Sequence, residues 1–266
     1  MKKILILSAI LIFACSSESE DSNINSNTTE KKILSIEIIE GDDLCKEGYN
    51  YSYTYDNDNI TLATGQYYLS SCLSQGWTEW EYNEPFNTEY QYFSDKIVVS
   101  NIGNNVGVNE VYFDDNGHIT GMSSWENLGD YQIIFDNGYI NKLGGYDFEW
   151  QNGNIIRVDN NQNSSSYVYT YSNISNKTSF ILRPLLYSFS FIGENIPLYS
   201  YGLYGEKSSK LPISQTQYLN NETVVFNYDY ILDDEGYPIY ININETSDYN
   251  NENYERDYTM KLTYTN

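Results

Sequence analysis

The chain has 266 residues, with 37 acidic and 14 basic side chains and a formal net charge of −23. A surface this acidic repels the phosphates of nucleic acids, so we do not expect a nucleic-acid partner. Tyrosine is abundant, with 29 residues, and asparagine, serine, threonine and glycine are frequent. This composition favours β-strands joined by turns over helices.

The N-terminus has the pattern of a secretory signal peptide. Met1-Lys2-Lys3 precedes an apolar run over residues 4–13, which is too short for a membrane span of about 20 residues. The next residues, Ile12-Phe13-Ala14-Cys15, resemble the lipobox of bacterial lipoproteins. This resemblance implies cleavage after Ala14 and attachment of lipid to Cys15. An ordinary signal peptide with an incidental cysteine is the alternative.

We therefore divide the chain into a signal peptide over residues 1–14, a tether over 15–31 and a single β domain over 32–266. Loss of Lys2 and Lys3 changes the formal net charge from −23 to −25. The tether has little to bury, and we expect it to be disordered. Its early acidic residues resemble an export signal of Gram-negative lipoproteins, which implies an outer-membrane lipoprotein at the cell surface. The periplasmic face is the alternative.

The sequence contains three cysteines. With Cys15 lipidated, Cys45 and Cys72 remain as a pair. Outside the cytoplasm they can form a disulfide that closes a loop of 27 residues, or they can stay as two buried thiols. Metal binding by this pair is not expected, because the cysteines are far apart and have no histidines beside them.

Aromatic and apolar residues alternate with polar ones along much of the chain. Tyr49, Tyr51, Tyr53 and Tyr55 share one face of a predicted strand. A hairpin unit then recurs at residues 111–119, 133–140, 148–156 and 225–240, and three of its turns contain Asn-Gly, the strongest short hairpin signal. We predict an all-β fold in which an antiparallel up-and-down meander forms a rolled sheet or a half or full barrel. Prolines and glycines predict one irregular insertion near residues 182–212.

Three segments near the C-terminus carry a more specific resemblance. Residues 202–212 read GLYGEKSSKLP, and they precede a tyrosine-rich strand over 226–230 and the turn Asp-Asp-Glu-Gly-Tyr-Pro over 233–238. These segments are similar to a family of uncharacterised Gram-negative lipoproteins with a porin-like or rolled β-sheet fold. The hairpins also resemble the tyrosine–aspartate repeats of large secreted β-shell proteins. The resemblance implies a fold but supplies no catalytic residue.

Catalytic groups are sparse in this sequence. His118 is the chain's single histidine and lies beside a turn glycine, where we expect it to be idle. Trp77, Trp80 and Trp150 lie near carboxylates in the sequence and are candidate ligand-binding aromatics, as in sugar-binding sites. No Walker loop or dinucleotide fingerprint is present, so no cofactor is expected.

Clustered oxygen ligands make calcium a secondary hypothesis. Asp56 and Asp58 lie in one predicted turn, and Asp233 and Asp234 lie in another. The simpler interpretation is that these aspartates are turn residues, selected for the backbone geometry of the turns.

We conclude from the sequence that this is a lipid-anchored envelope protein with a non-enzymatic binding or accessory role. Its partner, besides the membrane, would be a glycan, a peptide or another envelope protein. The alternatives are a structural or protein-interaction lipoprotein of the cell surface and a carbohydrate-active enzyme.

Overall fold

The computed structural model describes residues 31–41, 46–69, 81–82, 85–102, 108–123, 132–178, 205–219, 222–249 and 252–265. Cys15, Cys45, Cys72, Trp77 and Trp80 lie outside these residues. The lipid anchor, the disulfide and two of the tryptophan candidates therefore stay predictions. Within the described residues, no helix is long and apolar enough to cross a membrane.

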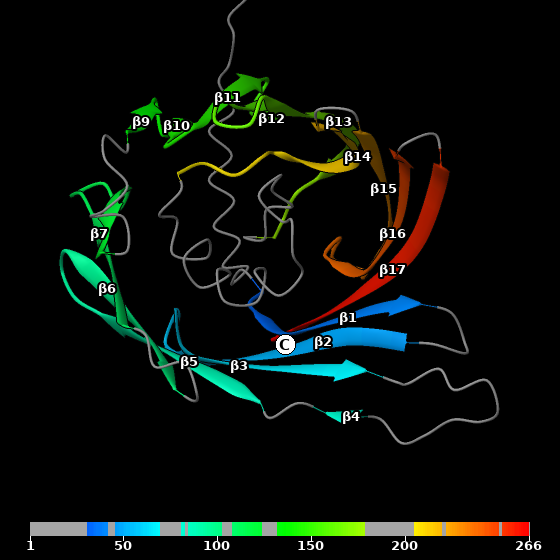
Figure 1. The fold of residues 1–266 in the computed structure, drawn as a ribbon. Helices are drawn as coiled ribbons and strands as arrows, with labels where there is room; N and C mark the ends of the chain where they lie inside the picture. Colours follow the sequence, from blue (N-terminus) through cyan, green and yellow to red (C-terminus); the bar gives the residue numbers. More distant parts are fainter. Residues whose placement is uncertain are drawn as a thin grey trace, which may run out of the picture. The chain divides into compact units, whose positions relative to one another are not determined.

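The described residues form seventeen strands (Figure 1). The first eight are β1 (Ile33–Gly41), β2 (Lys46–Asp56), β3 (Asn59–Leu69), β4 (Glu81–Tyr82), β5 (Phe86–Tyr92), β6 (Lys96–Ile102), β7 (Val108–Phe113) and β8 (Ile119–Met122). The next five are β9 (Ile133–Asp136), β10 (Tyr139–Leu143), β11 (Tyr146–Gln151), β12 (Asn154–Asn160) and β13 (Ser165–Ser175). The last four are β14 (Lys210–Leu219), β15 (Glu222–Leu232), β16 (Pro238–Tyr249) and β17 (Glu252–Tyr264).

Sixteen of these strands form an antiparallel ring. From β9 to β17 each strand pairs with the next, and β17 then pairs with β1. The ring continues through β2, β3, β5, β6 and β7 to β8, while the two-residue β4 extends the ladder of β3. Between β8 and β9 the described residues form no ladder. The sheet is thus a nearly closed barrel with one seam, which confirms the predicted up-and-down meander.

Alternation along the strands separates an apolar interior from a polar outer face. On β2, Tyr51 and Tyr53 are buried, whereas Ser52 and Thr54 between them are exposed. The other strands repeat this pattern, with one core cluster that includes Ile36, Ile97, Val111, Ile140, Val158, Tyr167, Ile243 and Met260. The burial of these side chains supplies the main stabilisation of the barrel.

One end of the barrel, which we call the turn rim, holds the start of β1 and the turns that follow β2, β5, β7, β9, β11 and β15. Close to this rim, aromatic side chains of six strands donate a hydrogen bond to a backbone carbonyl of the neighbouring strand, at 2.6–2.8 Å. The pairs are Tyr55–Ile33, Tyr92–Ile60, Trp150–Ile140, Tyr171–Ile155, Tyr230–Pro212 and Tyr264–Pro238. These bonds satisfy polar tips that burial would otherwise leave unpaired. This aromatic layer is part of the packed core.

The described end of the predicted irregular insertion lies along the turn rim. Glu206 donates its backbone N–H to the Gly138 carbonyl at 2.8 Å, and Ser209 donates to the Gly153 carbonyl at 2.9 Å. The insertion ends before residue 212, because β14 begins at Lys210 and Pro212 already pairs with Tyr171. Proline is tolerated there because the register of the ladder shifts beside it. Residues 182–204 of the predicted insertion are outside the described part of the chain.

Candidate functional site

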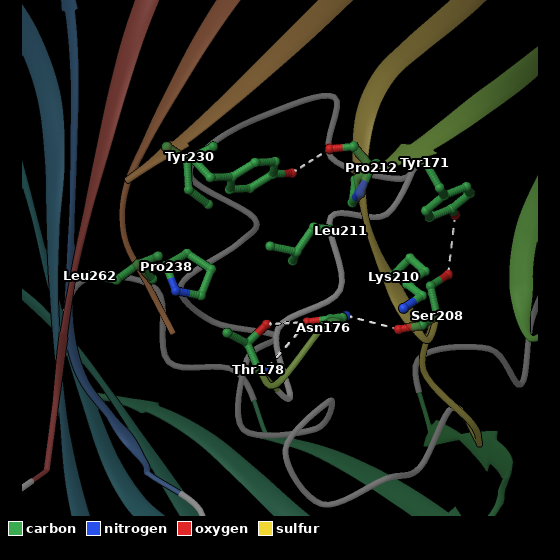
Figure 2. A pocket seen from close by; sticks show the side chains of 11 residues that line it. Tyr171, Asn176, Thr178, Ser208, Lys210, Leu211, Pro212, Tyr230, Pro238 and Leu262 are labelled. Carbon is green, nitrogen blue, oxygen red and sulfur yellow. Dashed lines mark hydrogen bonds between the residues drawn. The ribbon is translucent and has the colours of Figure 1, made fainter. Parts of the chain in front are cut away.

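A small pocket lies inside the barrel near the turn rim (Figure 2). Its lining comes from β13 to β17, from the residues that follow β13 and from the segment that enters β14: Tyr171, Asn176, Thr178, Ser208, Lys210, Leu211, Pro212, Tyr230, Pro238, Ile241 and Leu262. Its volume of about 10 Å³ is that of a single water molecule. The pocket is therefore too small for an organic ligand.

The pocket is where the three segments of the family resemblance meet. Ser208 lies in the first segment, Tyr230 ends the tyrosine-rich strand, and Pro238 ends the turn. Asn176 donates to the Ser208 carbonyl at 3.0 Å, and the Tyr171 hydroxyl lies 3.1 Å from the Ser208 Oγ (Figure 2). These contacts join the end of β13 to the start of β14. The residues that carry the family resemblance thus have a structural role at this point of the barrel.

A second depression is open to solvent and lies on the outer face of β15, β16 and β17. We call it the outer trench. One wall is the row Asn227, Asn244 and Asp257, which are paired across the three strands, and the other is the row Asp229, Asn242 and Thr259. Its floor is formed by the strand backbone at Tyr228, Ile243 and Tyr258. With a volume of about 340 Å³, it is large enough for a small organic ligand.

Amide and carboxylate groups dominate the walls of the trench. The Asn244 Nδ2 donates to both Glu255 Oε1 and Asp257 Oδ1, each at 2.9 Å, and this fixes the orientation of both carboxylates. On the opposite wall, the Thr259 hydroxyl donates to Asn242 Oδ1 at 3.4 Å. The trench therefore offers many hydrogen-bond acceptors, with amide donors between them, in a negatively charged setting.

Trp150 is the one candidate ligand-binding aromatic within the described residues, and the structure makes it part of the core. Its indole N–H donates to the Ile140 carbonyl at 2.8 Å, and its ring lies 4.7 Å from that of Tyr139. The indole is partly buried and packs against the core. Trp77 and Trp80, the other two candidates, lie outside the described residues.

The four aspartates of the calcium hypothesis serve in turns and ion pairs. Asp233 Oδ1 accepts from the backbone N–H groups of Glu235 and Tyr237 at 2.9 Å, and Lys31 lies 2.8 Å from Asp233 Oδ2. Asp58 pairs with Lys32 at 2.8 Å. Within the described ranges, no three His, Cys, Asp or Glu side chains converge to hold a metal ion.

Lysine contacts also shift the pKa values of these groups. Burial alone would raise the pKa of Asp233, but the bonds from Lys31 and from the turn backbone lower it below its ordinary value. Hydrogen bonds to Asp233 and Glu235 raise the pKa of Lys31. Both groups therefore stay charged at neutral pH, so the turn is held by charge.

No family model and no curated protein matches the sequence. Among solved structures, a porin-like protein from Bacteroides uniformis is similar with a TM-score of 0.54 and 15% identity, over 88% of this chain and 96% of that one. A porin-like protein from Bacteroides vulgatus is similar with a TM-score of 0.27 and 12% identity, over 88% of this chain and 98% of that one. At these identities the first likeness establishes the fold alone: the chain has a porin-like β-barrel fold, as the resemblance implied.

The residues of the outer trench were not among the site residues predicted from the sequence. Their signal is the period-two pattern in residues 227–229, 242–244 and 257–259, where polar residues take the outward positions of three strands. Such a pattern is typical of any solvated strand face. Only the register that brings the two rows together distinguishes this face.

Proposed function

We propose that this protein is a non-enzymatic binding protein of the bacterial envelope, whose barrel stands in water and is held at the membrane by lipid on Cys15. The observation that carries the proposal is the polarity of the outer face of the barrel. Its shape resembles that of a porin-like protein, but the side chains that it presents outward are those of a protein surrounded by water.

Charged residues lie on the outer face in several parts of the ring. Cross-strand or same-strand ion pairs join Lys96 to Glu110 at 2.6 Å, Lys142 to Asp147 at 3.8 Å and Arg157 to Asp159 at 2.9 Å. Their strands alternate them with buried inward residues such as Ile97, Val111, Phe148 and Val158.

Barrels that span membranes have the opposite arrangement, with an apolar outer band and a polar interior. A lysine or arginine on the lipid face costs about 2–4 kcal/mol at the centre of the bilayer. Several such residues together would make insertion unfavourable. A barrel that stands in water needs an anchor to stay at a membrane, and multiple acyl chains on Cys15 would provide a stable one.

The geometry around His118 is that of a packed side chain. The imidazole stacks on the Phe135 ring at 4.3 Å, and its Nδ1 lies 4.0 Å from Asp114. The open trench, by contrast, is a surface to which a ligand has direct access.

Replacement of residues 1–14 by a signal peptide that is cleaved without lipidation, combined with Cys15→Ser, tests the proposal. The native chain should incorporate an alkyne-tagged palmitate and sediment with membranes. The variant should incorporate no label and stay in the soluble extract without detergent. A variant that still needs detergent for extraction would overturn the proposal. Protease added to intact cells would then separate the two leaflets, since only a surface-exposed protein is degraded.

A further inference from the structure

We propose that the outer trench binds a neutral oligosaccharide, which lies across β15, β16 and β17. This inference rests on the proposed function, because it requires the outer face to be in water. It goes further by assigning a site and a class of ligand.

The trench runs across the strands rather than along them. Its two walls are successive outward rows, and each row takes one residue from each of three adjacent strands. Adjacent strands lie about 4.8 Å apart, so the trench is about 10 Å long. Together with its volume of about 340 Å³, this length suits an extended chain of two sugar rings.

The hydrogen-bonding groups of the walls match hydroxyl groups. A hydroxyl both donates and accepts, so it can donate to the carboxylates of Asp229 and Asp257 and accept from an amide. Asn227 and Asn242 offer such amides from opposite walls. Because Asn244 holds the Asp257 and Glu255 carboxylates in place, these acceptors are ordered before a ligand arrives, which lowers the entropic cost of binding.

Other classes of ligand fit the trench less well. Anionic ligands are disfavoured because Asp229, Glu255 and Asp257 surround the trench and no lysine or arginine lines it. A metal ion needs converging ligands, which the described residues do not form. A peptide that binds as an added strand needs unpaired backbone groups, but Ile243, at the centre of the floor, is paired on both sides, with Tyr228 on β15 and Tyr258 on β17.

A tyrosine lies where a stacking partner for a sugar ring would be useful. Tyr240 is the next outward residue on β16 beyond Asn242, and it pairs with Ile231 on β15 and Lys261 on β17. Its side chain is partly exposed. Aromatic rings give apolar contact to ligands whose edges are polar. Tyr240 thus extends the trench toward the turn rim with a partly apolar surface.

Affinity electrophoresis and titration calorimetry with defined probes test the proposal. The full-length lipidated protein in detergent micelles would be assayed against maltohexaose, cellohexaose, xylohexaose and mannohexaose, with a hexagalacturonate and calcium chloride as charged probes. The trench variant is Asp229→Ala with Asn242→Ala. The control variant is Glu89→Ala with Gln91→Ala, which removes an exposed carboxylate and an exposed amide from the outer face of β5.

We expect at least one neutral hexasaccharide to bind, with affinity at least tenfold weaker in the trench variant and unchanged in the control. Thermal melts of both variants should match that of the native protein, because all four positions are outward. Absence of binding to every neutral probe, equal loss in both variants, or preference for hexagalacturonate or calcium would overturn the proposal. These outcomes are distinct from failure of the proposed function, which would be shown by a variant without lipid on Cys15 that still needs detergent for extraction.

Discussion

The imidazole of His118 stacks on the ring of Phe135, with ring centres 4.3 Å apart and an angle of 10° between the ring planes. His118 lies in the turn between β7 and β8, and Phe135 lies on β9. The pair therefore bridges the seam of the barrel at the turn rim, where the described residues form no ladder. The single histidine of the chain has a structural role, which the sequence analysis did not anticipate.

Removal of this stack should weaken the closure of the barrel. We expect His118→Ala to lower the free energy of unfolding by about 1 kcal/mol, the scale of an aromatic pair in contact. His118→Phe keeps a ring over Phe135 and should retain most of the stability. Urea unfolding followed by tyrosine fluorescence measures both. Equal losses in the two variants would show that the stack contributes little.

Gly205 should be intolerant of a side chain. Its φ of +73° is unfavourable for other residues, and a Cβ there would clash with the Gly138 carbonyl and lie 3.0 Å from the Phe135 ring. Gly117→Ala measures the loss of stability caused by the positive φ alone, because its φ is +79° but the space around it is open. Gly121→Ala is the second control, because its site is open and its φ is ordinary.

We expect the loss of stability to rise from Gly121→Ala through Gly117→Ala to Gly205→Ala. The first should be close to neutral, the second about 1 kcal/mol and the third clearly larger. Thermal denaturation of the three variants gives the order. If Gly205→Ala were as stable as Gly117→Ala, the result would contradict the close approach of Gly205 to the Gly138 carbonyl.

The aromatic layer at the turn rim can be tested by removal of a single oxygen. Tyr230→Phe leaves the Pro212 carbonyl without its 2.7 Å hydrogen bond, and we expect a loss of about 1 kcal/mol. Tyr218→Phe is the matched control, because Tyr218 is 48% exposed. Denaturant unfolding should separate the two variants. A control that loses as much as Tyr230→Phe would argue against the buried hydrogen bond.

The same layer predicts sensitivity to alkaline pH. Burial raises the pKa of Tyr55 and of Tyr171 to about 12, above the value near 10 of an exposed tyrosine. The unfolded chain thus loses these protons first, and stability that is full below pH 10 should fall as the pH rises toward 12. Unfolding curves between pH 8 and pH 12 measure this fall. A Tyr55→Phe, Tyr171→Phe double variant should show a shallower dependence, and an unchanged slope would contradict the assignment.

The meander and its inward tyrosines could be predicted because both depend on local patterns. Alternation assigns faces along one strand, and Asn-Gly specifies tight turns: Asn137 and Gly138 have φ values of +49° and +83°, and Asn152 and Gly153 have +51° and +73°. The turn after Asp114 differs, because the carboxylate of Asp114 accepts from the backbone of Asn116 and His118 at 2.9 Å. Both turn types follow from nearby residues.

Closure and the candidate site could not be predicted in this way. The β1–β17 ladder pairs Ile36 with Leu262, two residues that are far apart in the sequence and carry no mark of their partnership. The outer trench likewise depends on register, since Asn227 and Asp257 share a wall only through Asn244 between them. Proximity to carboxylates in the sequence likewise did not reveal that the Trp150 indole donates to a carbonyl of the neighbouring strand.

We propose that the outer wall of the barrel faces water. A nitroxide label at Thr54 on β2 or at Asn242 on β16, in the lipidated protein on vesicles with Cys45 and Cys72 replaced by serine, measures this directly. Collision with a water-soluble nickel complex should be strong at both positions, and collision with oxygen dissolved in the bilayer should be weak. Labels that are protected from nickel and relaxed by oxygen would place the wall in lipid and contradict the claim.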